Sequence, residues 1–115
     1  EKDCEFAEAS PGLIGLETCF PLLLDLVRSG DLPLGRLVDA LTAAPARIVG
    51  LPSPTIREEA IAELVLVDPE RTWTVTPERL RSKSKNTPFL GKEVRGSIDL
   101  TMARGEIVFE AGERA

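Results

Sequence analysis

The sequence contains no histidine and only two cysteines, and these scarcities exclude whole classes of site. Without histidine nitrogens, the chain has no imidazole ligands to offer a zinc ion. Cys4 and Cys19 lie fifteen residues apart, with no second cysteine or histidine near either, so they are not a credible zinc pair. We interpret them as two unpaired thiols in a reducing compartment rather than as a disulfide.

Membrane segments, secretion signals and basic surfaces are also missing. The longest apolar stretch, Phe20–Leu24 followed by Leu26 and Val27, is far too short to span a bilayer. No positively charged segment followed by an apolar one marks a signal peptide. The formal net charge of −5 argues against a nucleic-acid partner, because nucleic-acid-binding faces are usually basic. We therefore expect a cytoplasmic protein whose partners are neither nucleic acid nor a membrane.

The first half of the chain predicts helices. Apolar residues at helical spacing through Phe20–Val27 predict a helix that Gly30 ends. Pro21 is tolerated there if it falls in the first helical turn. A second helix is predicted over about Leu34–Thr42, and a short third helix over Pro45–Val49.

The second half predicts strands. Four segments have the composition or the alternation of strands: 63–68, 72–75, 97–102 and 106–110. The first is apolar and ended by Asp-Pro, which predicts a buried strand. Thr76–Leu80 has the pattern of a capped helical turn, and the basic stretch from Arg81 to Lys92 predicts a solvated loop. The second half is therefore predicted to be a small β-unit of at least four strands.

Helices followed by strands favour an α+β order or two separate pieces. The helical half has too little chain to cover its own apolar faces, so we expect it to pack against something absent from the sequence. A second copy of the chain would also supply that cover, and the sequence leaves a homodimer open.

Five segments combine glycine, proline and apolar residues in a distinctive order. They are Ala9–Thr18 with Phe20–Leu24, Pro45–Leu51, Glu63–Pro69, Ser82–Phe89 with Gly91 and Gly96, and Gly105–Phe109 with Gly112. Gly-Leu-Glu-Thr in the first and Ser-Lys-Asn-Thr-Pro-Phe in the fourth are the more specific pieces. Together, over nearly all 115 residues, they resemble the C-terminal part of the dihydroorotase family, in the cyclic amidohydrolase group.

Three positions depart from the family pattern. Ala44 stands where the family usually has asparagine before Pro-Ala-Arg, which leaves Thr42 as a poorer N-cap. Glu58-Glu59-Ala60 replaces a glycine-containing turn, and Glu63 replaces a common aspartate. These departures indicate a diverged member or relaxed constraint.

The resemblance implies an α/β fold in two parts. Residues 1–50 would be the C-terminal end of a metal-dependent-hydrolase (β/α)8-barrel, comprising a substrate loop and the last helices. Residues 51–115 would be the C-terminal strands of the accompanying β-sandwich, which the family builds from both chain ends. The chain would then be a piece of a longer protein, and the remainder of that protein would be its main partner.

The resemblance also implies an activity for that longer protein. Dihydroorotases interconvert N-carbamoyl-L-aspartate and dihydroorotate in de novo pyrimidine synthesis, with zinc or a related divalent ion as the metal. Because the family's zinc ligands include several histidines, the resemblance implies no catalytic and no metal-ligating residue in this chain. The piece alone is expected to be inactive and to bind no zinc.

One loop is still expected to reach the small-molecule substrate. In the family, the loop before Gly-Leu-Glu-Thr offers backbone groups to the dihydroorotate ring, and the matching residues here are Pro11 and Gly12. Gly12 qualifies physically, because a missing side chain lets the backbone approach a ligand closely. Pro11 stands where relatives vary, so only a main-chain contact transfers.

Other residues have structural interpretations. Glu17 is more simply a charge at a helix N-terminus than a general acid. Trp73 is expected to pack within the β-unit, and Asp68 to be a turn residue. Lys83 and Lys85 are interpreted as parts of a solvated loop, with pairing to barrel carboxylates or to a partner chain as the alternative.

Three functional hypotheses remain open. The first is the enzyme piece, for which dihydropyrimidinase or allantoinase is the alternative activity. The second is a non-catalytic, dihydroorotase-like structural partner of aspartate transcarbamoylase, which the absence of histidine fits. The third is a free-standing α+β interaction module.

Overall fold

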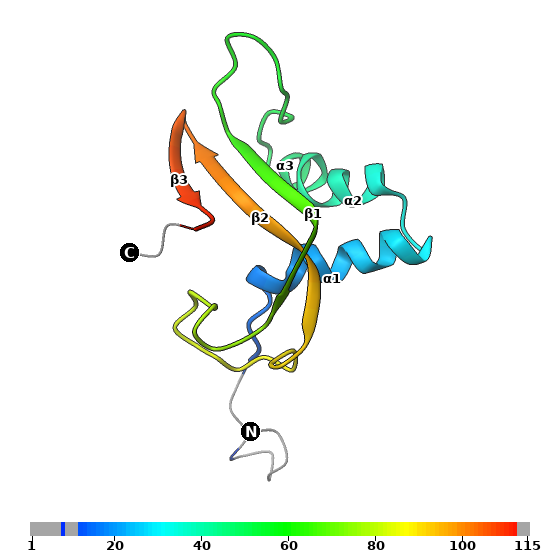
Figure 1. Cartoon of the computed structure of the whole chain (residues 1–115). Coiled ribbons are helices and arrows are strands. Elements are labelled where there is room, and N and C mark those ends of the chain that lie inside the picture. Colours follow the sequence, from blue (N-terminus) through cyan, green and yellow to red (C-terminus); the bar gives the residue numbers. More distant parts are fainter. Residues whose placement is uncertain (1–7, 9–11, 113–115) are drawn as a thin grey trace.

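The computed structural model describes residue 8 and residues 12–112. Three helices come first in this part of the chain, α1 (Leu16–Ser29), α2 (Leu34–Leu41) and α3 (Ala43–Ile48). Three strands follow, β1 (Leu64–Thr74), β2 (Glu93–Ala103) and β3 (Glu106–Glu110), and they form one antiparallel sheet in the order β1-β2-β3. Figure 1 shows the helices on one side of a strongly twisted sheet, with the long connections 49–63 and 75–92 at its opposite ends.

The helices confirm the predicted helical half, with shifted boundaries. Gly30 ends α1 in the left-handed conformation, at φ 85°, and its N–H bonds to carbonyls of the last turn. Because α1 begins at Leu16, Pro21 lies inside the helix, and the prediction that it falls in the first turn is wrong. Thr42 precedes α3 without capping it, since its hydroxyl donates instead to the carbonyl of Val38 at 2.6 Å.

The sheet has three strands among the described residues, so the prediction of at least four is wrong. The segments 63–68 and 72–75 are parts of one strand, β1, which continues through Asp68-Pro69 across an irregularity. Asp68 pairs with Ser97 and Thr72 with Arg95, so three residues of β1 face a single residue of β2. A bulge of this kind needs no ladder hydrogen bond from proline, and Pro69 is therefore compatible with the strand.

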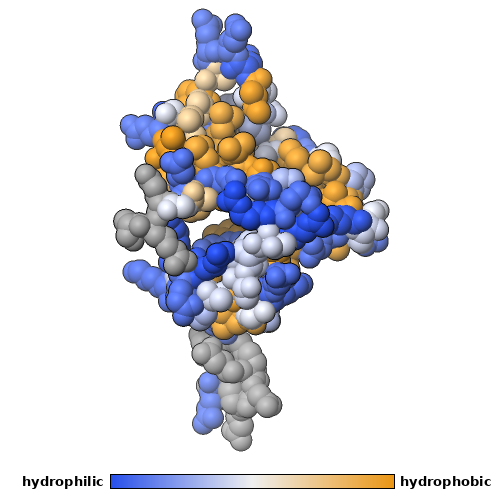
Figure 2. Space-filling view, viewed as in Figure 1, coloured by the Kyte–Doolittle hydropathy of each residue, from blue (hydrophilic) through white to orange (hydrophobic). Residues whose placement is uncertain are grey.

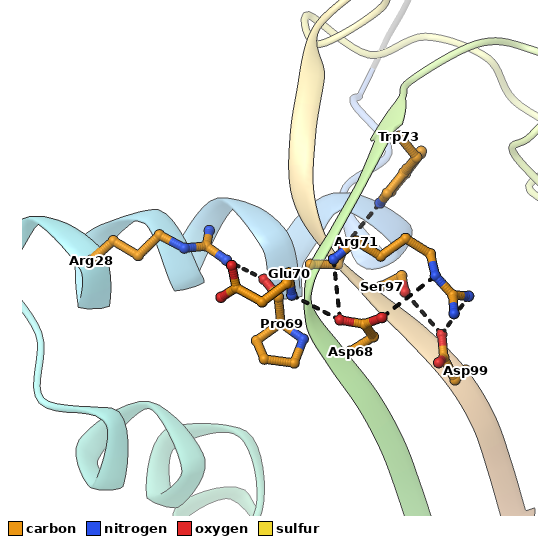
Figure 3. Close-up of polar contacts among 9 residues, drawn as sticks. Arg28, Asp68, Pro69, Glu70, Arg71, Trp73, Ser97 and Asp99 are labelled. Atoms are coloured by element: carbon orange, nitrogen blue, oxygen red, sulfur yellow. Dashed lines mark hydrogen bonds and ion pairs between the residues drawn. The ribbon is translucent and has the colours of Figure 1, made fainter.

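Polar contacts stabilise this bulge from both sides (Figure 3). The Asp68 carboxylate accepts hydrogen bonds from the backbone N–H groups of Glu70 at 2.9 Å and Arg71 at 3.1 Å. Asp68 makes these local bonds within strand β1, so the prediction that it is a turn residue is wrong. From the last turn of α1, the Arg28 guanidinium donates to the carbonyl of Pro69 and, at 3.0 Å, to that of Arg95. Arg28 thus satisfies carbonyls that flank the bulge and ties the helix to both strands.

Gly96 is the residue of β2 that faces the bulge, and α1 lies directly against it. A Cβ at this position would lie 3.0 Å from Cδ2 of Leu24 and 3.6 Å from Cα of Pro21. Its φ of 121° is also one that side-chain-bearing residues rarely adopt. The contact between helix and sheet therefore requires glycine here.

The core joins the helical segment, the sheet and the long loop. Its buried centre consists of Val75, Leu80 and Val94, and the partly buried residues packed around it are Ile14, Leu22, Trp73 and Phe89. The indole N–H of Trp73 donates to the carbonyl of Gly96 at 2.9 Å, so the sole tryptophan packs within the β-unit as predicted.

A large apolar surface remains outside this core (Figure 2). The prediction of a buried strand at 63–68 is wrong, because the apolar residues Leu64–Val67 are all exposed. In α2 only Leu37 is buried, while Leu34 and Val38 on the same helix are more than half exposed. Within the described residues, no helix combines the length and the apolar character needed to cross a membrane.

Replacement of Gly96 by alanine tests the contact between α1 and β2. The strained φ and the close approach to Leu24 predict a loss of about 2–4 kcal/mol in the free energy of unfolding. Urea unfolding followed by Trp73 fluorescence measures it. Gly35→Ala is the control, because Gly35 lies in α2 with open space around it, and alanine there is expected to be neutral or stabilising. An unchanged urea midpoint for Gly96→Ala would show that the contact between α1 and β2 does not require glycine at this position.

Candidate functional site

Two segments far apart in the sequence lie side by side at the N-terminal end of α1. The first is the Gly12 loop, residues 12–15, with the first turn of α1. The second is the basic loop, residues 80–89, which follows the turn at 77–79. These segments carry Gly-Leu-Glu-Thr and Ser-Lys-Asn-Thr-Pro-Phe, and hydrogen bonds connect them.

Asn86 makes two of these hydrogen bonds with the Gly12 loop. Its side-chain amide donates to the carbonyl of Gly12 at 2.7 Å, and its main-chain carbonyl accepts from the N–H of Ile14 at 3.0 Å. Gly12 has a φ of 71°, in the left-handed region, and a Cβ there would meet nothing within 4 Å. Hydrogen bonds therefore hold the loop at Gly12, and neighbouring atoms do not restrict its conformation.

Glu17 makes the other connection. Its carboxylate accepts hydrogen bonds from the backbone N–H groups of Arg81 at 2.9 Å and Ser82 at 3.0 Å. Both carboxylate oxygens are thereby engaged in holding the basic loop. Glu17 lies in the first turn of α1, as predicted, and these contacts fit a structural role better than that of a general acid.

The basic loop makes internal hydrogen bonds and buries a residue, which was not expected of a solvated loop. The Lys85 ammonium donates to the main-chain carbonyls of Leu80 and, at 2.7 Å, of Ser82, so this lysine binds its own loop instead of a carboxylate. Thr87 is buried. Lys83 is exposed, as expected of a solvated residue.

An open hollow lies between the two segments. It is lined by apolar side chains of the Gly12 loop and α1 together with residues of the basic loop, among them Leu13, Ile14, Leu16, Leu80, Arg81 and Thr87. Its surface is mainly apolar. The Arg81 guanidinium lies 4.7 Å from the ring centroid of Phe109, so the basic loop also contacts β3.

The described side chains around the hollow provide no metal site. Among the described residues, no three histidine, cysteine, aspartate or glutamate side chains are grouped so that they could hold a metal ion. The whole sequence lacks histidine, and Cys19 is a free thiol. The residues present therefore do not fit a zinc centre, and a glycine-containing loop beside an apolar hollow is what remains.

Comparison with known proteins identifies the relatives of this chain. No protein-family model matches it. A dihydroorotase of Anaeromyxobacter dehalogenans strain 2CP-C is 47% identical over 113 residues, which are 98% of this chain and 26% of that protein. A dihydroorotase of Geobacter metallireducens is 46% identical over 110 residues, again 26% of its length. By sequence, the chain belongs to the dihydroorotase family. It spans about a quarter of the length of these curated relatives.

Two solved structures similar to this chain are hydantoinases. The L-hydantoinase (dihydropyrimidinase) from Arthrobacter aurescens has a TM-score of 0.80 and 38% identity, and covers 91% of this chain and 24% of its own. A D-hydantoinase has a TM-score of 0.76 at 21% identity, over 88% of this chain and 22% of its own, and this likeness supports the fold alone. The arrangement of helices beside a small antiparallel sheet is thus one found in cyclic amidohydrolases.

The predicted site residues fall at the edge of the described chain. Gly12 is described and exposed, with its carbonyl bonded to Asn86, whereas Pro11 lies outside the described residues. Sequence reasoning did not single out Asn86. The available signal was its place in Ser-Lys-Asn-Thr-Pro-Phe, as the only asparagine of this dihydroorotase-family chain.

Glu17→Gln tests the connection between α1 and the basic loop. Glutamine keeps the shape but replaces a charged acceptor that serves two N–H groups with a neutral one. Because hydrogen bonds to charged groups are the stronger ones, amide hydrogen exchange at Arg81 and Ser82 is expected to accelerate roughly tenfold. Glu58→Gln, at an exposed position in the connection between α3 and β1, is the control. Exchange at both amides as slow as in the control would show that Glu17 does not hold the loop.

Proposed function

We propose that this chain is the C-terminal portion of a dihydroorotase, the zinc-dependent cyclic amidohydrolase that interconverts N-carbamoyl-L-aspartate and dihydroorotate in de novo pyrimidine synthesis. The observation that carries the proposal is 47% identity to a dihydroorotase over 98% of this chain. The relative is about four times longer, since the match covers 26% of it. In this proposal the remainder of such a protein is the chain's partner and a cyclic amide its substrate, in the cytoplasm.

The proposed place of the chain is the end of a (β/α)8-barrel followed by part of its β-sandwich. Residues 1–50 would supply a substrate loop and the last helices, and residues 51–115 the C-terminal strands. The exposed apolar residues support this division. Leu34, Val38 and Leu41 of α2 would face barrel strands, while the exposed Leu64–Val67 of β1 would face or pair with sandwich strands from elsewhere in the protein.

The proposed role of the chain in the reaction is binding. Zinc would be held by residues outside this chain, because the described residues do not fit a metal centre. When bound there, zinc polarises a carbonyl or activates water, which is the chemistry that hydrolysis of a cyclic amide needs. Pro11 and Gly12 would offer main-chain groups to the substrate ring, and the positive φ of Gly12 and its bare Cα favour close approach.

Two alternatives remain as competing proposals. The similarity to hydantoinase structures favours dihydropyrimidinase as the alternative activity, but the dihydroorotases are more identical in sequence, at 46–47% against 38%. A non-catalytic, dihydroorotase-like partner of aspartate transcarbamoylase is favoured only by the absence of histidine. Neither alternative explains the dihydroorotase matches as directly.

The activity test uses the chain alone and in a chimera. Purified by itself, the 115-residue chain is expected not to turn over dihydroorotate, even with added zinc, because no histidine ligands are present. When it replaces the matched segment of the Anaeromyxobacter dehalogenans dihydroorotase, turnover is expected and is measured by the absorbance of dihydroorotate. The same chimera assayed on dihydrouracil provides the comparison of substrates.

Three results would contradict the proposal. Turnover by the isolated chain would refute the assignment of the metal to another part of the protein. An inactive but folded chimera would favour the non-catalytic partner. Faster turnover of dihydrouracil than of dihydroorotate would favour the dihydropyrimidinase alternative.

The exposed apolar faces give a second prediction. The isolated chain is expected to self-associate or to bind a fluorescent hydrophobic probe, whereas the chimera at equal molarity is expected to bind far less probe per molecule. Leu66→Lys, on the exposed part of β1, is expected to reduce probe binding by the isolated chain, and Lys83→Ala serves as the control. A monomeric chain that binds no probe would contradict the proposal that the rest of a longer protein covers these apolar faces.

A further inference from the structure

We propose that Asn86 is a positioning residue for substrate binding, because it fixes the backbone of the loop from Gly12 to Ile14. This inference deepens the proposed function and rests on it. Asn86 itself need not touch the substrate. It would act through the peptide groups that it holds.

The geometry supplies a two-point attachment. The Asn86 side chain donates to the carbonyl of Gly12 at 2.7 Å, and its main-chain carbonyl accepts from the N–H of Ile14 at 3.0 Å. One residue thus holds the peptide groups on both sides of Leu13. Because glycine populates many backbone conformations and the space beside Gly12 is open, these two bonds select the conformation at φ 71°.

Asn86 can hold the loop because its own position is fixed. Its backbone N–H donates to the hydroxyl of Ser84 at 3.2 Å, and the next residue, Thr87, is buried. The backbone at the start of the same loop is also held. Lys85 donates to two of its main-chain carbonyls, and Glu17 accepts from two of its N–H groups. Hydrogen bonds therefore connect Gly12, through the basic loop, to α1 and to the core around Leu80.

The chemistry at position 86 requires a donor. An asparagine amide has two N–H donors, whereas an ionised aspartate of nearly the same shape has only acceptors. A carboxylate oxygen placed 2.7 Å from the carbonyl oxygen of Gly12 would repel it, and alanine would leave the carbonyl without this donor. The predicted order of function is therefore asparagine, then alanine, then aspartate, which is not the order of similarity in size.

The experiment compares variants of the chimera described above, in which the chain is part of a complete dihydroorotase. Asn86→Ala is expected to raise KM for dihydroorotate about five- to tenfold and Asn86→Asp more than tenfold, with kcat within about twofold, because a loop that binds ground state and transition state alike affects KM. Lys83→Ala is the matched control, since Lys83 lies in the same loop and is exposed, and it is expected to leave both constants unchanged. Thermal melting of each variant is recorded in parallel.

The outcomes separate this inference from the proposed function. An unmodified chimera without turnover refutes the proposed function, and the inference falls with it. An active chimera in which both Asn86 variants keep the KM of Lys83→Ala refutes the inference alone. Lowered melting temperatures with an unchanged KM would assign Asn86 a purely structural role, which also overturns the inference. A raised KM in the order alanine then aspartate, at an unchanged kcat, supports it.

Discussion

The close approach of α1 to β2 at Gly96 is the contact on which the rest of the described structure depends. Leu24 and Pro21 reach the sheet only because Gly96 has no side chain, and the bulge of β1 lies opposite the same residue. Arg28 donates to the carbonyl of Pro69 within that bulge and to the carbonyl of Arg95 on β2, and the Trp73 indole donates to the carbonyl of Gly96. Contacts around Gly96 thus hold α1, β1, β2 and the bulge of β1 together.

The candidate site takes its geometry from this point. The packing of α1 on β2 fixes the orientation of the helix, and its first turn carries Glu17 to the backbone of the basic loop. The basic loop in turn carries Asn86 to Gly12. The exposed Gly12 loop is therefore connected by hydrogen bonds to a buried core, which is how a flexible glycine can present its backbone in one conformation.

Local patterns in the sequence were sufficient for the helices and the paired strands, but not for features that depend on distant residues. Asp68-Pro69 has the local chemistry of a strand end, and the strand continues only because Gly96 and Arg28 accommodate the bulge. The contact between Asn86 and Gly12 joins residues 74 positions apart and involves a main-chain acceptor, which leaves no compositional trace. Burial at 63–68 was predicted from apolar content, yet burial requires covering atoms that the described residues do not supply. The family resemblance, by contrast, rested on side-chain identities and was confirmed.

The contrast between a small buried core and wide exposed apolar faces is the physical basis for the proposal that this chain is part of a longer protein. Its most direct test is sedimentation velocity of the 115-residue chain mixed with the part of the Anaeromyxobacter dehalogenans dihydroorotase that lies outside the matched segment. The account predicts a single species with the combined mass of the two pieces. Two separate boundaries, with the chain sedimenting as a monomer, would contradict it.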